Sequence, residues 1–213
     1  MTRAPHPSSG PKYLRGFSKG ADGPLGRGSA RGRAPSPRFT RRTWLKLIHW
    51  TTVPFFVWFL LVTPAHVASW GWAWVELHSV FGLVFVSLAL IWTADLVIRG
   101  LASRPGPKLT GAARAIHRPL HLALIWGLFG VAFTGFLLGL TASRTLFAGT
   151  VLPIAPPLGL PEANRWAGTL HTVEFYAVAA IAAVHVAYHL WRHIRLRDNA
   201  LRIMVPRALH RFL

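Results

Sequence analysis

Histidine is the residue type in this sequence whose number and placement best suit chemistry. The chain has 11 His and no Cys, which excludes disulfides, thiolate metal sites, iron–sulfur ligation and cysteine nucleophiles. Ionisable side chains are costly inside a membrane and usually mark a functional site there. Seven histidines lie within or at the ends of long apolar stretches: His49, His78, His117, His121, His171, His185 and His189.

The spacing of the histidines in the last apolar stretch places two of them near one face of a helix. His171 and His185 are 14 residues apart, which on an α-helix is about 21 Å along the axis and within about 40° of one face. His78 matches the depth of His171, and His49 matches that of His185. Each pair could bind a haem iron from both sides as neutral imidazoles. His189 lies on the same face as His171, so geometry leaves it as an alternative to His185.

Further polar residues cluster at the depth of His49. His117 and His121 are four residues apart and could bind a metal, line a quinone pocket or contact haem propionates. Lys46 and Arg118 are candidates for propionate contacts near the same depth. The pattern does not identify a catalytic residue.

The elements that position these residues are four apolar stretches. Each is near the ~20 residues that a helix needs to cross a bilayer, and backbone groups cannot stay unpaired in lipid. The composition agrees, with 52% hydrophobic and only 14% charged residues. The prediction is an all-α protein, a four-helix transmembrane bundle. The helices are expected at about 44–63, 75–98, 119–140 and 170–191.

Charge sets the expected topology. The net charge is +18, yet a soluble nucleic-acid binder would be less apolar, so the expected partners are membrane lipid and no nucleic acid. Residues 1–42 are basic and rich in Gly, Pro and Ser, which predicts a disordered tail before a membrane domain at 43–208. The loops before the second and fourth helices carry only Arg144 and Arg165. The positive-inside rule therefore places both termini in the cytoplasm.

Several motifs resemble the bacterial cytochrome b561 family over roughly residues 41–208. They are Ile48-His49-Trp50, the step from His78 to Gly82, the spacing from His171 to His185, His121 with Gly135 fourteen residues later, and the tail segment 198–207.

The resemblance implies a multi-pass protein of the bacterial inner membrane with two b-type haems and a quinone site. Carried over by position, the haem ligands fall on His49, His78, His171 and His185, which favours His185 over His189. The implied function is electron transfer between the quinone pool and a periplasmic donor or acceptor. Some members oxidise superoxide and reduce quinone. Related cytochrome b subunits are instead the quinone-facing part of hydrogenases or dehydrogenases.

The sequence departs from the family pattern in helix four. Thr172 stands where the family often has Glu, with Glu174 two residues on, and Leu190 follows His189 where a second His is expected. These departures bear on the substrate and the proton route. A non-redox alternative is a His-lined metal carrier or an assembly anchor, but a cation path would usually also include carboxylates.

Overall fold

The computed structural model describes residues 40–148, 151–198, 200–205 and 210–211. Most of the tail predicted to be disordered, residues 1–39, lies outside the described residues. The first helix begins at Arg41, two residues before the expected start of the membrane domain.

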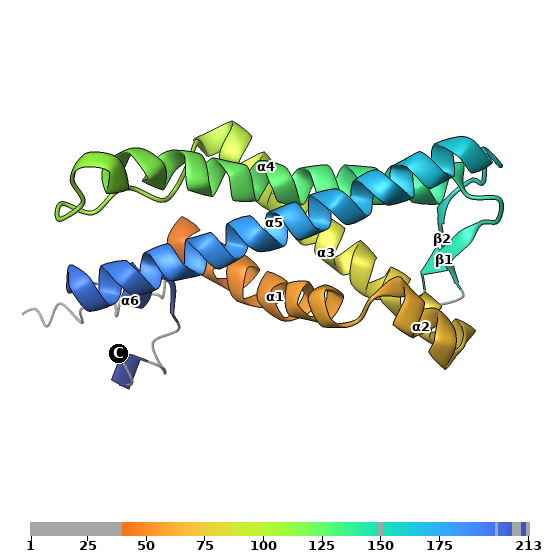
Figure 1. Cartoon of the computed structure of the whole chain (residues 1–213), viewed down its shortest axis with the longest axis horizontal. Coiled ribbons are helices and arrows are strands. Elements are labelled where there is room, and N and C mark those ends of the chain that lie inside the picture. Colours follow the sequence, from red (N-terminus) through yellow and green to blue (C-terminus); the bar gives the residue numbers. More distant parts are fainter. Residues whose placement is uncertain (1–39, 149–150, 199, 206–209, 212–213) are drawn as a thin grey trace, which may run out of the picture. The chain divides into compact units, whose positions relative to one another are not determined.

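Long helices make up most of the described chain (Figure 1). In chain order the elements are α1 (Arg41–Leu61), α2 (Pro64–Trp70), α3 (Trp72–Arg99), α4 (Gly111–Thr141), β1 (Leu146–Ala148), β2 (Leu152–Ala155), α5 (Pro161–Arg195) and α6 (Ala200–Met204). Among the described residues, α1, α4, α5 and the segment Glu76–Arg99 of α3 are long and apolar enough to cross a membrane. The predicted all-α transmembrane fold is confirmed.

Two of the spanning helices extend well beyond the apolar stretches that predicted them. α4 begins at Gly111 instead of near residue 119, and Pro119 lies inside it. α5 begins at Pro161 instead of near residue 170, with proline in its first turn. The apolar run measures only the part of a helix in lipid, whereas the backbone stays hydrogen-bonded past that boundary. Proline suits a first turn because it has no N–H to leave unpaired.

The segment between the third and fourth expected helices contains regular structure. β1 and β2 pair antiparallel, with Phe147 opposite Pro153 and an irregularity in register after Leu146. β1 contacts α3, and β2 contacts α4. Backbone groups of a segment at the membrane surface still need partners, and this hairpin provides them locally.

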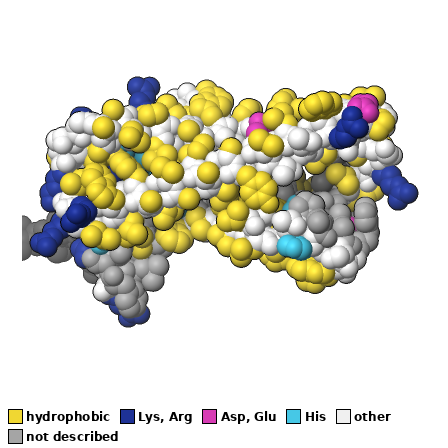
Figure 2. Space-filling view, viewed as in Figure 1, with side chains coloured by type: hydrophobic (Ala, Val, Ile, Leu, Met, Phe, Trp, Pro, Cys, Tyr) yellow, Lys and Arg dark blue, Asp and Glu magenta, His cyan; other side chains and the backbone are white. Residues whose placement is uncertain are grey.

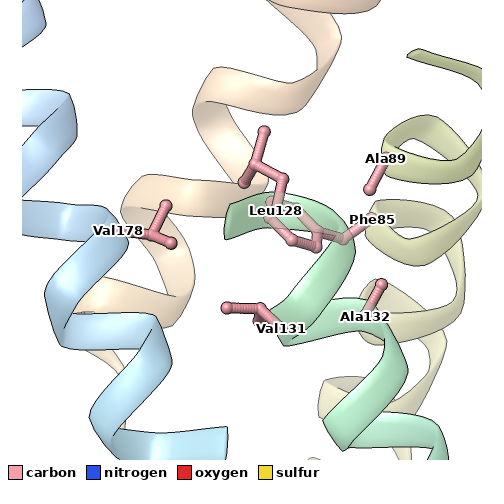
Figure 3. Close-up of a cluster of buried hydrophobic side chains, with 6 residues drawn as sticks. All are labelled: Phe85, Ala89, Leu128, Val131, Ala132 and Val178. Carbon is pink, nitrogen blue, oxygen red and sulfur yellow. The ribbon is translucent and has the colours of Figure 1, made fainter. Parts of the chain in front are cut away.

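The apolar core joins α3, α4 and α5 (Figure 3). α4 and α5 run side by side along much of their length (Figure 1). Their backbones approach closely, since a Cβ added at Gly127 would lie 2.6 Å from Val178 Cγ2. Phenylalanines of α1 pack against this core. The buried cluster consists of Phe85, Ala89, Leu128, Val131, Ala132 and Val178.

Ion pairs hold the helix ends farthest from the hairpin. Arg41 of α1 contacts Asp95 of α3 at 2.7 Å. Arg192 of α5 contacts Asp198 at 2.7 Å, and both side chains are buried. These pairs tie α1 to α3, and the end of α5 to the segment that leads into α6.

Candidate functional site

Two histidines from different helices lie near the end of the bundle that carries β1 and β2, here called the hairpin end. They are His78 of α3 and His171 of α5, and their imidazoles are close enough to interact electrostatically. The His78 ring meets the Phe59 ring edge-on, with centroids 4.8 Å apart. Its Nδ1 is buried without a hydrogen-bond partner among the described residues. An unpaired nitrogen in an apolar interior is costly, so this imidazole suits a bound group.

Hydrogen bonds fix the tautomer of His171. Its Nδ1 lies 3.0 Å from the Val131 carbonyl oxygen, and because a carbonyl only accepts, Nδ1 carries the proton. The neutral ring then keeps a lone pair on Nε2, the form in which histidine binds metals. Gly135 makes room for the ring, since an added Cβ there would lie 3.0 Å from His171 Cε1.

A carboxyl group lies beside this histidine. Glu174 Oε2 accepts a hydrogen bond from Thr134 Oγ1 at 2.8 Å, and the same Oγ1 is 3.2 Å from His171 Nδ1. Gly130 faces the same carboxyl group, because a Cβ added there would be in ordinary contact with Glu174 Oε1, at 3.5 Å. The hairpin end therefore combines two imidazoles with a threonine and a carboxyl group.

Four imidazoles gather at the opposite end of α4 and α5, here called the α6 end. They are His117 and His121 of α4, and His185 and His189 of α5. Ring centroids are 4.4 Å apart for His117 and His121, 4.9 Å for His121 and His185, and 4.5 Å for His185 and His189. The ligand atoms of His121, His185 and His189 all lie within 4.8 Å of one another, so these three side chains can converge on one metal ion.

Hydrogen bonds also orient this cluster. His121 Nδ1 donates to the His117 carbonyl oxygen at 2.6 Å, which leaves a lone pair on Nε2. His117 Nε2 lies 3.1 Å from Ser103 Oγ. In the part of the chain that the structure describes, His185 Nδ1 and His189 Nε2 are buried without partners. Both of the histidines that the sequence left as alternatives therefore lie in the cluster.

α1 brings His49 toward the same cluster. Its ring meets the rings of Trp50 and Trp92 edge-on, with centroids 5.8 Å apart in each case. It is also close enough to His121 and His185 to interact electrostatically. The structure thus brings His49 near His185, and His78 near His171.

The remaining candidates occupy less central positions. Lys46 Nζ donates to the Val205 carbonyl oxygen at 3.3 Å. Arg118 is exposed on α4, next to His117. Sequence reasoning missed Ser103 and Thr134. A signal existed for Thr134, because within 119–140 it is the only hydrogen-bonding side chain besides His121 and Trp126.

The residues present fit haem. Neutral imidazoles from separate helices are the ligands that haem iron takes in many b-type cytochromes. Space is available beside His78, because a Cβ added at Gly82, one turn along α3, would meet nothing within 4 Å. A bundle of membrane-spanning helices with imidazoles from facing helices at both ends has the architecture of a membrane-bound b-type cytochrome.

Comparison with known families agrees with this class. The family model for prokaryotic cytochrome b561 matches residues 40–207. The chain belongs to this family, and it is therefore a multi-pass membrane protein of b-type haem electron transfer. A comparison with curated proteins finds no significant match. The family expected from the sequence motifs is confirmed.

Proposed function

We propose that this protein is a di-haem cytochrome of the bacterial inner membrane that links the quinone pool to a periplasmic redox partner. In this proposal His78 and His171 hold one b haem, and His49 and His185 hold the other. Bound haem supplies a one-electron couple whose potential depends on its ligands and surroundings. The observation that carries the proposal is the convergence of imidazoles from separate helices at both ends of α5.

The protein's own residues orient the ligands and exclude water between them. The Val131 carbonyl accepts the Nδ1 proton of His171 and so leaves the lone pair of Nε2 available to a metal. On α5, Val178 lies between the two ligands and is buried against α4. An apolar segment between the two sites keeps water out of the interval that electrons would cross.

The quinone site is proposed at the α6 end, beside His117 and His121. Both side chains lie next to the proposed ligand His185, but the proposed ligand pair of this haem, His49 and His185, does not include them. A quinone ring accepts hydrogen bonds, and imidazoles offer donors that also exchange protons. Lys46 and Arg118 belong to the same end, where we propose that they contact propionates.

The partner at the hairpin end is proposed to be periplasmic. An anionic donor such as superoxide would be attracted by cations, but Arg165 there is paired with Glu162 at 2.6 Å. A second candidate function is the quinone-facing subunit of a larger dehydrogenase or hydrogenase. It is favoured by the apolar surface of the hairpin, where Val151 is 83% exposed, because such surfaces often mark protein interfaces.

Haem quantification tests the ligand assignment. We expect the detergent-purified protein to contain two b haems per chain in its reduced-minus-oxidised spectrum. His78→Ala and His185→Ala should each remove one haem, whereas the matched variant His189→Ala should keep both. Loss of one haem in His189→Ala with retention in His185→Ala would move the ligand role to His189, and a folded wild-type protein without haem would overturn the proposal.

The same preparation separates the possible donors. Ubiquinol added to the oxidised protein should reduce the haems at a rate that superoxide dismutase does not change. Failure of ubiquinol to reduce them would remove the quinone from the proposal. Reduction by a superoxide source that the dismutase abolishes would instead favour superoxide as the donor at the hairpin end.

A further inference from the structure

A chain of hydrogen bonds connects Glu174 to the imidazole nitrogen of His171 that faces away from the proposed haem. We propose that Thr134 and Glu174 are positioning residues that act through His171 and lower the midpoint potential of the hairpin-end haem. This inference rests on the proposed function, because it assumes that His171 is a haem ligand.

The direction of each hydrogen bond follows from the atoms present. Thr134 has one hydroxyl proton, and its nearest acceptor is Glu174 Oε2 at 2.8 Å, ahead of the carbonyl oxygens of Gly130 at 3.0 Å and Val131 at 3.3 Å. A carboxylate is also the strongest acceptor of the three. The lone pairs of Thr134 Oγ1 then face His171 Nδ1, 3.2 Å away, and the single N–H of that nitrogen is shared between Thr134 Oγ1 and the Val131 carbonyl oxygen at 3.0 Å. The chain therefore runs from the His171 N–H through the Thr134 hydroxyl to the carboxylate.

This arrangement is of a kind known to tune metal ligands. A carboxylate that accepts the second N–H of a ligating histidine makes that histidine a stronger electron donor. Here the threonine transmits the effect, and hydrogen bonds in series polarise one another. A stronger donor and a nearby negative charge both favour the oxidised iron, so both lower the potential.

The location of Thr134 and Glu174 inside the bundle indicates that the hydrogen bond between them has a functional role. Thr134 is 3% exposed, and Glu174 lies within the membrane-spanning helix α5. The whole chain has only 6 Asp and Glu. Acidic groups inside a span are expensive and are usually functional. The competing interpretation is a hydrogen bond that merely joins α4 to α5, which predicts an effect on stability and none on potential.

The experiment is a spectroelectrochemical titration of both haems at one fixed pH. Thr134→Val removes the hydroxyl with little change of shape, and Glu174→Gln removes the charge. We expect each to raise the potential of the hairpin-end haem alone, by about 59 mV, which is tenfold in the equilibrium constant of a one-electron couple. His78→Ala, which should lack that haem, identifies its signal.

A double variant tests whether the two residues act as a chain. Because Thr134 is the connection, Thr134→Val combined with Glu174→Gln should shift the potential by less than the sum of the two single shifts. The matched control is Thr93→Val, since Thr93 is also buried but donates to the Ala89 carbonyl of its own helix at 2.9 Å. It should leave both potentials unchanged.

The outcomes separate this inference from the proposed function. Three results would overturn this inference and leave the proposed function standing. They are unchanged potentials in variants that bind both haems, equal shifts of the two haem potentials, and additive shifts in the double variant. A wild-type protein without a haem at the hairpin end would overturn the proposed function. If Thr134→Val loses haem, the test uses Thr134→Ser and Glu174→Gln instead. The inference is supported if Thr134→Ser keeps the wild-type potential while Glu174→Gln raises it. It is overturned if the potential of Glu174→Gln is unchanged.

Discussion

Single residues of α4 prepare the lone pairs on which metal binding depends. His171 and His121 each direct their Nδ1 toward a backbone carbonyl of α4, from Val131 and His117 respectively. A ring protonated at Nδ1 keeps Nε2 free to bind a metal. The bond from His121 to the His117 carbonyl lies within α4, whereas the bond from His171 to the Val131 carbonyl joins α5 to α4. The same chemical result is thus reached once within a helix and once between helices.

Gly82 provides a residue-scale test of where a haem lies. A Cβ added at Gly82 would meet nothing within 4 Å, so the polypeptide by itself has room for a larger side chain at this position. A haem held by His78 would occupy the same space. We expect Gly82→Leu to lose the hairpin-end haem and retain the other, as measured by haem per chain. Its elution on gel filtration should not change.

The control for Gly82→Leu is Ala123→Leu, which adds the same side chain at an exposed position of α4. This variant should keep both haems. A Gly82→Leu protein with two haems would show that the macrocycle does not approach α3 at this turn.

Helical spacing predicted that His171, His185 and His189 lie near one face of a single helix. Spacing alone could not choose between His185 and His189, which the family resemblance did in favour of His185, and the structure gathers both into one cluster. Thr134 was not predicted, because nothing in its sequence neighbours shows that α5 brings Glu174 opposite it. Such a contact depends on how two helices pack, which a single sequence does not record.

At the scale of elements, small residues of α4 determine how closely α5 packs. Gly127, Gly130 and Gly135 each lie where an added Cβ would meet a side chain of α5. The structure shows that the helix facing these glycines is α5. Helix ends were predicted less well, because hydropathy reports the lipid boundary and α4 and α5 continue beyond it.

Gly127→Ala tests this interface. The added Cβ would lie 2.6 Å from Val178 Cγ2, and a β-branched valine has few rotamers with which to move away. Overpacking costs about 1–3 kcal/mol, and the ~1 kcal/mol that alanine gains over glycine in a helix offsets part of that cost. We expect a net destabilisation of up to about 2 kcal/mol in detergent-solubilised unfolding.

Two further variants establish the cause of that loss. Gly168→Ala is the matched control, because its added Cβ would meet only Leu138 Cδ1, at 3.4 Å, and the end of a leucine can move. It should be neutral or slightly stabilising. Gly127→Ala should lower the free energy of unfolding by less in a Val178→Ala background than in the wild-type protein. If the two costs are equal, the two side chains do not clash.

At the scale of the whole described molecule, charge and apolar surface are segregated. Figure 2 shows a broad hydrophobic surface with Lys and Arg side chains toward its two ends. The hairpin end has Arg144 and Arg165, and the second of these is paired with Glu162. The α6 end carries many more cations, among them Arg41, Arg42, Lys46, Arg99, Arg104, Lys108, Arg114, Arg118, Arg192, Arg195, Arg197 and Arg202. This asymmetry was evident from sequence, whereas the hairpin was not, because its short strands lack a clear alternating pattern.

The asymmetry predicts which end faces the cytoplasm. Positive charge is retained on the cytoplasmic side during insertion, so the α6 end should be cytoplasmic and the hairpin end periplasmic. Because the chain has no Cys, single cysteines can report this without a background. Arg144→Cys should react with a membrane-impermeant maleimide in intact spheroplasts, whereas Arg195→Cys should react only after lysis. The two positions are matched, since both are exposed arginines. Labelling in the reverse order would place the proposed quinone site on the periplasmic side and the hairpin end in the cytoplasm.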